Sequence, residues 1–313
     1  MADVVGIGSA YVDYFFSTDH KFLKSLQLKP EDDFLFSEKK LKSENILKSL
    51  SLITKSPGGI TPNTLSALSF LNIKSAYIGV IGKDQDGKYW KNKIGPIIKT
   101  KISFLGKMPM CACLLTDNGN ERTFLSEQNN HETDFLNRID IKFINKAKIL
   151  HIAPLISDTK KGINKTLEIL ASVNGPMVSF NPSMFYIERE KQKITPIIKK
   201  SDIVFFNEQE IKKLTGKNPK EASRYLISLG PKIIICTLSK KGALITTNKE
   251  QFLTGRHDVD NIVDTTGAGD TFAAGFLFGV LKKKSLKWSG SFANRLAAKS
   301  LSNFGQSWQQ KIK

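Results

Sequence analysis

The amino-acid sequence predicts a three-layer αβα fold, in which a doubly wound, mostly parallel sheet is covered by helices on both faces and carries a small β lid. Apolar runs of strand length alternate with segments of helix length along most of the chain. This alternation is typical of parallel strands joined by crossover helices. Two regions break the alternation, and they predict the lid. The 313 residues are enough for one large domain with a small appendage.

Seven apolar runs are predicted to be strands of the large sheet, and segments such as residues 61–72 and 162–173 are predicted to be crossover helices. In chain order the runs are "DVVGIG", "SAYIGVIG", "AKILHIA", "PMVSFNP", "DIVFFNE", "KIIICTLS" and "GALITT". Ligands of such sheets bind outside the carboxyl ends of the strands. The polar or glycine-rich positions that end the runs are therefore candidates for a binding site: residues 8–13, 82–87, 181, 207–210 and 237–242.

The predicted lid is formed by about residues 11–57 and 102–123. These regions contain "YVDYFF", "KISFLG" and "CACLLT", which alternate without a following crossover helix, and "SEKKLKSENILKSL", which has a helical pattern. Residues 1–313 are interpreted as one domain that includes this lid. Because exposed strand edges can pair with a second copy, a homodimer through the lid is one of the oligomeric states left open.

Composition and charge exclude several classes of protein. No apolar run approaches the roughly 20 residues that cross a bilayer, and the N-terminal stretch predicts a strand rather than a signal peptide, so a cytoplasmic protein with no membrane partner is expected. The formal net charge is +18, but the lysine pairs are dispersed without interleaved aromatic residues, which predicts solvated surfaces and no nucleic-acid partner. Cys111, Cys113, Cys236 and four scattered histidines fit neither a disulfide framework nor a zinc site, so packing is the expected role of the thiols.

The stretch "VDTTGAGDTFAAGF" places a glycine-rich turn before an apolar helix. Backbone N–H groups at the start of a helix hold anions well, so the turn could bind a phosphate, with Asp270 facing the same crevice. Local stability explains the pattern equally well, with Thr265 or Thr266 as the helix cap and the carboxylate near the positive end of the helix dipole. The P-loop and dinucleotide-binding patterns are absent. Phosphate chemistry would therefore need another arrangement.

That stretch resembles the C-terminal signature of the PfkB-type (ribokinase-like) carbohydrate and nucleoside kinases, and "PGGITPNTLSALSFLNIKSAYIGVIGKDQDGKYW" resembles their N-terminal signature. The resemblance implies an ATP-dependent kinase that transfers the γ-phosphate to a primary hydroxyl of a nucleoside or sugar. It implies Asp270 as the catalytic base and the backbone of Gly267, Ala268 and Gly269 as the anion hole. An ordinary carboxylate pKa near 4 would leave the base ionised at neutral pH.

The resemblance also implies an acceptor site. Asp13 of "GIGSAYVD" corresponds to the aspartate that binds substrate hydroxyls. In "GGITPN", Gly58 and Gly59 would let hydroxyls approach the backbone, and Asn63 would offer a polar partner. The alternatives are a water-facing carboxylate at the hinge of the lid for Asp13, and a helix that is capped by Thr61 with proline at its first position.

Three further residues correspond to positions around the phosphates and the metal ion. Asn207 and Glu210 of "NEQE" match the NxxE pattern that organises Mg2+, which Glu210 would bind partly through water. A solvated helix start is the alternative. Arg122 of "GNERT" would close over the phosphates from the lid, or would be a surface residue at a hairpin end. ATP and Mg2+ are the implied cofactors, and K+ is a further candidate.

The nucleotide site is implied by two weaker matches. Thr237 and Gly242 of "TLSKKG" resemble the TxGxxG turn beside the nucleotide, although Ser239 stands at the middle glycine and puts close backbone contact there in doubt. Asn294 lies in a stretch similar to the helix that borders the adenine of ATP, and it would line that pocket.

The sequence indicates the type of reaction more clearly than it indicates the substrate that accepts the phosphate. Within the family, "GIGSAYVD", "GNERT" and "DIVFFNEQE" are most similar to bacterial chains described as adenosine kinases, although Ser9 stands where that group tends to have asparagine. Aromatic residues of the lid could stack on a base, but lid core is the expected role of most of them. We therefore expect an adenosine-like nucleoside, with a simple sugar of the ribose, fructose or ketodeoxygluconate type as the alternative. A catalytically silent ligand-binding regulator is the alternative from another class.

Overall fold

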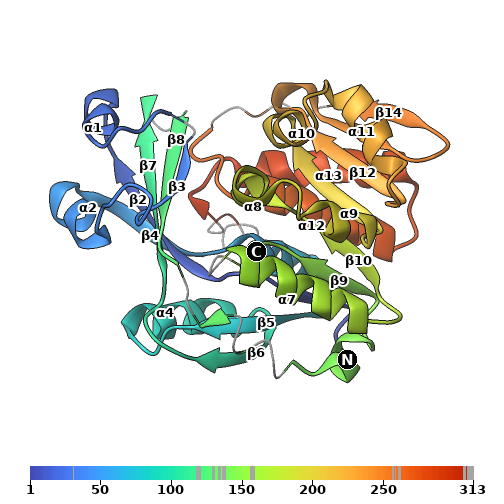
Figure 1. Cartoon of the computed structure of the whole chain (residues 1–313), viewed down its shortest axis with the longest axis horizontal. Coiled ribbons are helices and arrows are strands. Elements are labelled where there is room, and N and C mark those ends of the chain that lie inside the picture. Colours follow the sequence, from blue (N-terminus) through green and yellow to red (C-terminus); the bar gives the residue numbers. More distant parts are fainter. Residues whose placement is uncertain are drawn as a thin grey trace.

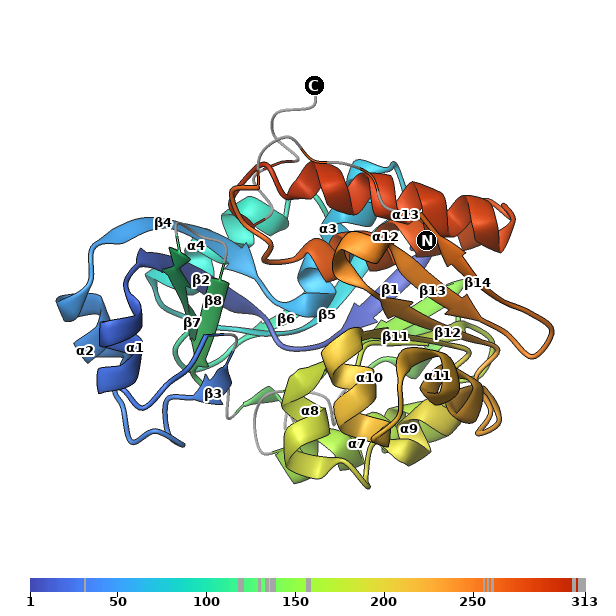
Figure 2. The same ribbon diagram turned by 90° about the horizontal axis from the view of Figure 1, so that it is seen from above.

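Within the residues that the structure describes, the framework of the protein consists of two sheets, one of nine strands and one of five. The computed structural model describes the chain except for residues 31, 118–120, 129–130, 133–134, 136–138, 156–158, 256, 258, 260–261, 306–307 and 309–313. Figure 1 shows the small sheet standing at one end of the large one. In Figure 2 the large sheet lies between two layers of helices, which is the predicted αβα arrangement.

The large sheet has the strand order β14-β13-β12-β11-β10-β9-β1-β5-β6. Its neighbouring strands are parallel from β12 to β6, and β13 and β14 add an antiparallel edge. The seven predicted runs all form strands of this sheet, which confirms the fold class. The strands are β1 (Val4–Ile7), β5 (Ser75–Ile81), β6 (Lys99–Phe104), β9 (Ile149–Ile152), β10 (Met177–Phe180), β11 (Ile203–Asn207), β12 (Ile233–Thr237), β13 (Ala243–Thr246) and β14 (Gln251–Thr254).

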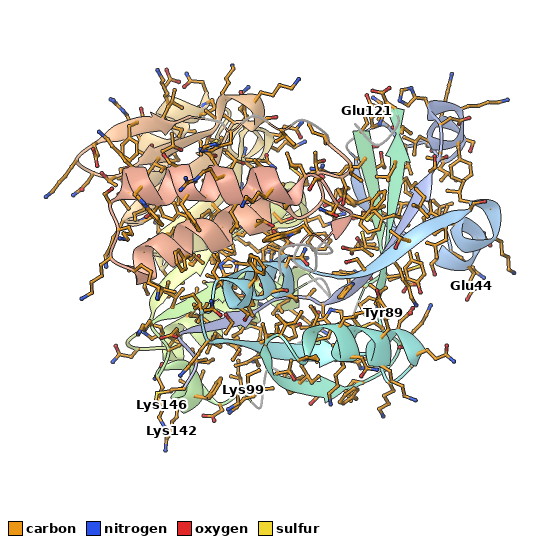
Figure 3. The ribbon with its side chains drawn as sticks, turned by 180° about the vertical axis from the view of Figure 1, so that it is seen from behind. Glu44, Tyr89, Lys99, Glu121, Lys142 and Lys146 are labelled. Carbon is orange, nitrogen blue, oxygen red and sulfur yellow. The ribbon has the colours of Figure 1, made fainter. Side chains whose placement is uncertain are left out.

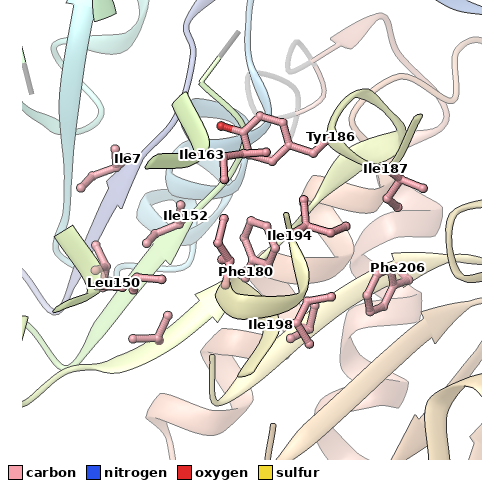
Figure 4. Close-up of a cluster of buried hydrophobic side chains, with 14 of the residues drawn as sticks. Ile7, Leu150, Ile152, Ile163, Phe180, Tyr186, Ile187, Ile194, Ile198 and Phe206 are labelled. Carbon is pink, nitrogen blue, oxygen red and sulfur yellow. The ribbon is translucent and has the colours of Figure 1, made fainter. Parts of the chain in front are cut away.

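Each face of the large sheet has its own apolar core. One face is covered by α3 (Ile60–Phe70), α4 (Gln85–Ile94), α12 (Ala268–Leu281) and α13 (Leu286–Ser300). The other is covered by α6 (Ile141–Ile144), α7 (Thr159–Ser172), α8 (Ser183–Glu190), α9 (Thr195–Lys199), α10 (Glu208–Thr215) and α11 (Pro219–Ile227). Figure 4 shows the second core, where Ile152 and Phe180 of the sheet lie near Ile163 and Tyr186 of the helices. Within the described residues, we find no helix that could span a membrane.

The small sheet has the strand order β3-β8-β7-β2-β4. Its strands are β2 (Tyr11–Ser17), β3 (Asp33–Leu35), β4 (Leu52–Gly58), β7 (Met110–Thr116) and β8 (Glu121–Ser126). Even-numbered residues of β7 pack in a small core with α1 (His20–Ser25) and α2 (Ser43–Ser49), whereas the odd-numbered residues form a separate cluster on the opposite face. Because successive side chains of a strand point to opposite faces, this second face, which we call the inner face of the lid, is free to line a site.

The structure corrects the predicted second lid segment. β6, which contains most of "KISFLG", pairs in parallel with β5 of the large sheet, so the second lid segment begins at β7 and extends through β8. The prediction failed because β6 is an edge strand whose residues are mostly half-buried. Such a strand alternates in polarity like a lid strand.

Contacts on both sides hold the lid against the large domain. Arg189 of α8 donates from its Nε to a carboxylate oxygen of Glu38, which follows β3, over 2.8 Å, and its guanidinium lies 4.1 Å from the ring centroid of Phe185. On the other side, the Tyr89 hydroxyl of α4 donates to the Lys55 carbonyl of β4 over 2.9 Å. Figure 3 labels Tyr89 where α4 lies below the lid. These contacts fix the inner face of the lid over the end of the large sheet.

Candidate active site

A cavity of about 1020 Å3 lies between the inner face of the lid, the carboxyl ends of β11 and β12, and the first turns of α10 and α12. This volume is at the upper limit for a pocket that holds one small ligand, roughly 300–1,000 Å3. All the predicted site residues except Gly58 line it. The chain positions that sequence patterns single out, from Asp13 to Asn294, are therefore brought together at the strand ends, as expected for such a sheet.

The start of α12 is open toward this cavity. The helix begins at Ala268, its N-cap is Gly267 with φ of 75°, and no side chain caps it. The alternative that Thr265 or Thr266 caps this helix is therefore wrong. Instead, the Asp264 carboxylate shapes the preceding turn, because it accepts hydrogen bonds from the backbone of Thr266 at 2.8 Å and of Gly305 at 2.9 Å.

The open helix start has the features of an anion site. The Ala268 N–H donates to the Thr265 carbonyl over 3.3 Å, so it is less available to a bound anion than predicted. For the N–H groups of Gly269 and Asp270 we find no acceptor in the described part of the chain. A Cβ built on Gly269 would meet no atom within 4 Å. Unpaired N–H groups at a helix start, with space in front of them, suit a phosphate group.

Asp270 lies in the first turn of α12 and is buried, with 8% of its surface exposed. One of its carboxylate oxygens accepts a hydrogen bond of 2.9 Å from the Asn63 side-chain amide of α3. Burial raises the pKa of Asp270 to about 7, although the Asn63 hydrogen bond and the positive charge of Arg122 act in the opposite direction. The sequence-based expectation of an ordinary pKa is thus wrong, because the sequence does not show the burial. A carboxyl group with this pKa can both accept and release a proton near neutral pH.

Asp13 projects from β2 into the same cavity, on the lid side. Burial, followed by the charges of Asp264 and Asp270, raises the pKa of Asp13 to about 8. The alternative of a water-facing carboxylate is wrong, since only 6% of its surface is exposed. A Cβ on Gly58 would lie 2.2 Å from a carboxylate oxygen of Asp13. Gly58 therefore makes room for Asp13, and it does not approach the cavity as predicted.

The start of α3 also differs from the sequence-based alternative. Gly59, with φ of 108°, is the N-cap of α3, and the helix begins at Ile60. Thr61 lies inside the helix and donates a 3.0 Å hydrogen bond to the Ile7 carbonyl of β1, so it is not the cap. The backbone of Gly59 and the side chain of Asn63 remain in the cavity wall.

Asn207 and Glu210 form a capping box at the start of α10. The Asn207 side chain accepts from the Glu210 backbone, and the Glu210 side chain accepts from the Asn207 backbone, each over 2.8 Å. Both line the cavity, and burial raises the pKa of Glu210 to about 7. The alternative of a solvated helix start is wrong for Glu210, of which 9% is exposed. The capping box places a buried carboxyl group at the strand end.

The residues that the sequence predicts beside a nucleotide hold their positions through backbone conformation and hydrogen bonds. Gly242 has φ of 84°, and Ser239 adopts φ of 50°, so Ser239 keeps a left-handed conformation at a cost of about 1–2 kcal/mol. The Asn294 amide donates to the Thr254 carbonyl and hydroxyl and to the Gly255 carbonyl. Those bonds occupy its nitrogen, so Asn294 shapes the wall rather than offering a free donor.

Sequence reasoning considered Tyr11 among the lid aromatic residues that could stack on a base, without choosing it, and it missed most of the rest of the inner face of the lid. Tyr11, Asp33, Cys111, Phe124 and Ser126 all line the cavity from β2, β3, β7 and β8. The alternation of β2 could have found Tyr11, because it lies two residues before Asp13 and so on the same face. The others come from β3, β7 and β8, whose places in the small sheet are not visible in the sequence.

The buried acids make stability depend on pH. Asp13, Asp270 and Glu210 have pKa values of about 8, 7 and 7 in the folded protein and about 4 in the unfolded chain. The folded protein therefore binds more protons than the unfolded chain at neutral pH, and the free energy of unfolding falls as pH rises. His151 opposes this below about pH 6.5, since burial lowers its pKa to about 4. We expect calorimetry of the ligand-free protein to show a Tm that falls between about pH 6.5 and about pH 8. A Tm that rises over this interval would contradict the assigned burial of the three acids.

The pfkB family carbohydrate kinases match this chain over residues 32–310. The chain belongs to this family. Its members are phosphotransferases with an alcohol group as acceptor, so this protein is a kinase of the sugar and nucleoside type. An uncharacterized sugar kinase of Archaeoglobus fulgidus is 30% identical over 242 residues, covering 76% of this chain and 95% of that protein.

Two solved structures have the same fold. The adenosine kinase from Sinorhizobium meliloti has a TM-score of 0.89 at 22% identity, covering 97% of this chain and 95% of the other. The adenosine kinase from Schistosoma mansoni in complex with 2-fluoroadenosine has a TM-score of 0.87 at 25% identity, covering 97% and 96%. The ribokinase-like fold that the sequence predicts is confirmed.

Proposed function

We propose that this kinase transfers the γ-phosphate of ATP to a primary hydroxyl of an adenosine-like nucleoside. The observation that carries the proposal is the buried Asp270 carboxyl group beside the open start of α12. Asp270 accepts the proton of the attacking hydroxyl while Asn63 holds the carboxylate in place. The N–H groups of the first turn of α12 stabilise negative charge on the transferred group, which is the main requirement of phosphoryl transfer. Arg122 adds positive charge from the lid.

We further propose Mg2+ as the metal cofactor. The pair of Asn207 and Glu210 fits this ion, because Mg2+ keeps several water ligands and binds through few protein carboxylates, and Glu210 is the acidic side chain at the start of α10 that is buried in the cavity wall. When bound, Mg2+ neutralises phosphate charge. A requirement for K+, a homodimer through the lid, a cytoplasmic location and the absence of a nucleic-acid partner remain proposals that rest on the sequence.

The acceptor half of the cavity favours a nucleoside over a free sugar. Tyr11 and Phe124 face it from the inner face of the lid, and Asp13 lines the same part of the cavity. The Tyr11 hydroxyl is buried, and we find no hydrogen-bond partner for it among the described residues. Aromatic rings stack on bases at about 1–3 kcal/mol per contact, whereas a free sugar offers no ring to stack on. The adenosine kinase of Schistosoma mansoni, solved with 2-fluoroadenosine, supports the same acceptor class.

A panel of nucleosides and free sugars tests the acceptor. With ATP and Mg2+ present, we expect ADP release to be fastest with an adenosine-like nucleoside, and kcat/KM to exceed that for ribose by about 5- to 150-fold from stacking alone. Phe124→Ala should reduce this preference without reducing turnover of ribose. If turnover were fastest with ribose, fructose or ketodeoxygluconate, the acceptor would be that sugar and not a nucleoside. Absence of ADP release with every acceptor would refute the proposed reaction.

Replacement of Asn63 tests how the base is positioned. Asn63→Ala removes a hydrogen bond that lowers the pKa of Asp270, and such a bond to a charged group is worth about 1.5–3 kcal/mol. We expect kcat to fall roughly 10- to 100-fold below neutral pH, with the acidic limb of the kcat profile displaced to higher pH. The exposed Asn174→Ala is the control. If kcat fell by the same factor at every pH and the pH profile kept its shape, Asn63 would not act through Asp270.

A further inference from the structure

A carboxyl group and two thiols lie together on the inner face of the lid. One ligand atom from each of Asp13, Cys111 and Cys113 lies within 4.8 Å of the others, and all three residues are buried. Asp13 and Cys111 also line the cavity. The sequence alone assigns these cysteines to packing, because two cysteines and a distant aspartate do not have the spacing of a zinc motif.

Strand pairing brings the three groups together. β2 and β7 are parallel neighbours, and their register places Asp13 opposite Cys111. Cys113 lies two residues further along β7 and therefore points to the same side. The cluster is built on the backbone of two adjacent lid strands. Its position does not depend on a loop.

The separation of the ligand atoms suits a tetrahedral ion. Thiolate sulfurs bind Zn2+ at about 2.3 Å, and carboxylate oxygens at about 2.0–2.2 Å, so two thiolates on one ion lie roughly 3.8 Å apart. Small rotations of side chains bring groups within 4.8 Å to that spacing. The cavity beside Asp13 and Cys111 leaves the fourth position open to water or another ligand. Two thiolates favour a borderline or soft ion over Mg2+.

The charges around the cluster favour a cation. The carboxyl groups of Asp264 and Asp270 lie close enough to act electrostatically on Asp13. Asp264 belongs to the turn before α12, and Asp270 to its first turn. Although the chain carries a formal net charge of +18, three carboxyl groups are therefore gathered in this part of the cavity. A bound divalent ion replaces the protons of the thiols and the carboxyl group, which pass to the solvent.

We propose that Asp13, Cys111 and Cys113 form a binding site for Zn2+ in the acceptor half of the cavity. An ion at this site occupies the Asp13 carboxylate, so it prevents the acceptor from binding and inhibits the kinase. The binding site itself is independent of the proposed function, whereas the inhibition rests on it.

Metal binding is measured on the reduced full chain without nucleotide. In equilibrium dialysis we expect one Zn2+ per chain at this site. In Cys113→Ser the loss of affinity should exceed the roughly 10- to 100-fold that follows removal of an outer-shell partner, because a direct ligand is removed. Cys236→Ser is the matched control, because Cys236 is a cysteine on β12 that does not line the cavity. The complex with Co2+ should show the absorption of thiolate-to-cobalt charge transfer in the wild type and in Cys236→Ser, and should lose intensity in Cys113→Ser. Equal Zn2+ affinity in Cys113→Ser and Cys236→Ser would overturn the proposal.

Two further measurements keep the proposal testable. The first does not need a variant, so it can be made even if Cys113→Ser does not fold, and the second distinguishes failure of the metal site from failure of the proposed reaction. In the wild type alone, Zn2+ should slow alkylation of Cys111, which is the thiol of the pair that lines the cavity. Unchanged alkylation of Cys111, or a Co2+ complex without thiolate absorption, refutes the site. In kinetics, Zn2+ should raise the KM of the acceptor and leave the KM of ATP unchanged. If Zn2+ binds through the thiols but no acceptor is turned over, the metal site stands and the proposed function fails.

Discussion

Asp270→Asn is expected to lower kcat by about 10²- to 10⁴-fold, the usual contribution of a general base. The substitution keeps the shape of the side chain and leaves an oxygen that can accept the 2.9 Å hydrogen bond from Asn63. It removes only the ability to take the proton of the attacking hydroxyl. Steady-state kinetics with the best acceptor of the panel measures the loss, and calorimetric titration of that acceptor checks that binding is retained.

The same variant separates a catalytic role from a structural one. The unfolded chain ionises Asp270 near its ordinary pKa of about 4, whereas burial holds the pKa of Asp270 at about 7 in the folded, ligand-free wild type, so stability is lost as pH rises from about 4 to about 7. The amide that replaces the carboxyl group cannot ionise, so the variant should have a higher Tm than the wild type at about pH 8 and a similar Tm at about pH 4. The exposed Asp140→Asn is the control. Undiminished turnover in Asp270→Asn would refute its role as the base, and a lower Tm at both pH values would assign the residue to structure.

Gly269→Ala is expected to leave the fold intact and to impair phosphoryl transfer. The added Cβ would meet no protein atom within 4 Å, and alanine is favoured over glycine inside a helix by about 1 kcal/mol. The protein itself therefore gives no reason for a glycine here. A phosphate held against the first turn of α12 does give one, because the methyl group would displace it from the N–H groups. Loss of one such donor lowers kcat by about 10²- to 10³-fold.

Paired measurements of stability and kinetics test this prediction. The Tm of Gly269→Ala should be equal to or higher than that of the wild type. Its kcat should fall, and its KM for ATP should rise. Gly255→Ala is the control, since a Cβ there also meets no atom within 4 Å and Gly255 lies outside the cavity lining. If Gly269→Ala retained full activity, the phosphate would have to lie elsewhere in the cavity. A fall in Tm would instead indicate a contact that the ligand-free fold does not show.

The sequence by itself determined the features that depend on local pattern. The apolar runs predicted seven strands of the large sheet because a strand buried on both faces is continuously apolar. The stretch around Asp270 predicted a glycine-rich helix start, and its resemblance to the PfkB-type kinases led to the family. Candidate residues as distant as Asp13 and Asn294 were identified because each lies in a recognisable motif.

Tertiary structure alone decided what depends on contacts between distant segments. It assigned β6 to the large sheet, placed Tyr11, Asp33 and Phe124 in the cavity wall, and brought Cys111 and Cys113 beside Asp13. These outcomes follow from strand pairing, which one sequence does not specify when its alternating stretches can pair in several ways. The raised pKa of Asp270 likewise follows from burial by segments far along the chain. Local pattern thus identified the stretch that we propose to be catalytic, and only the packed structure determined the electrostatic environment of its carboxyl group.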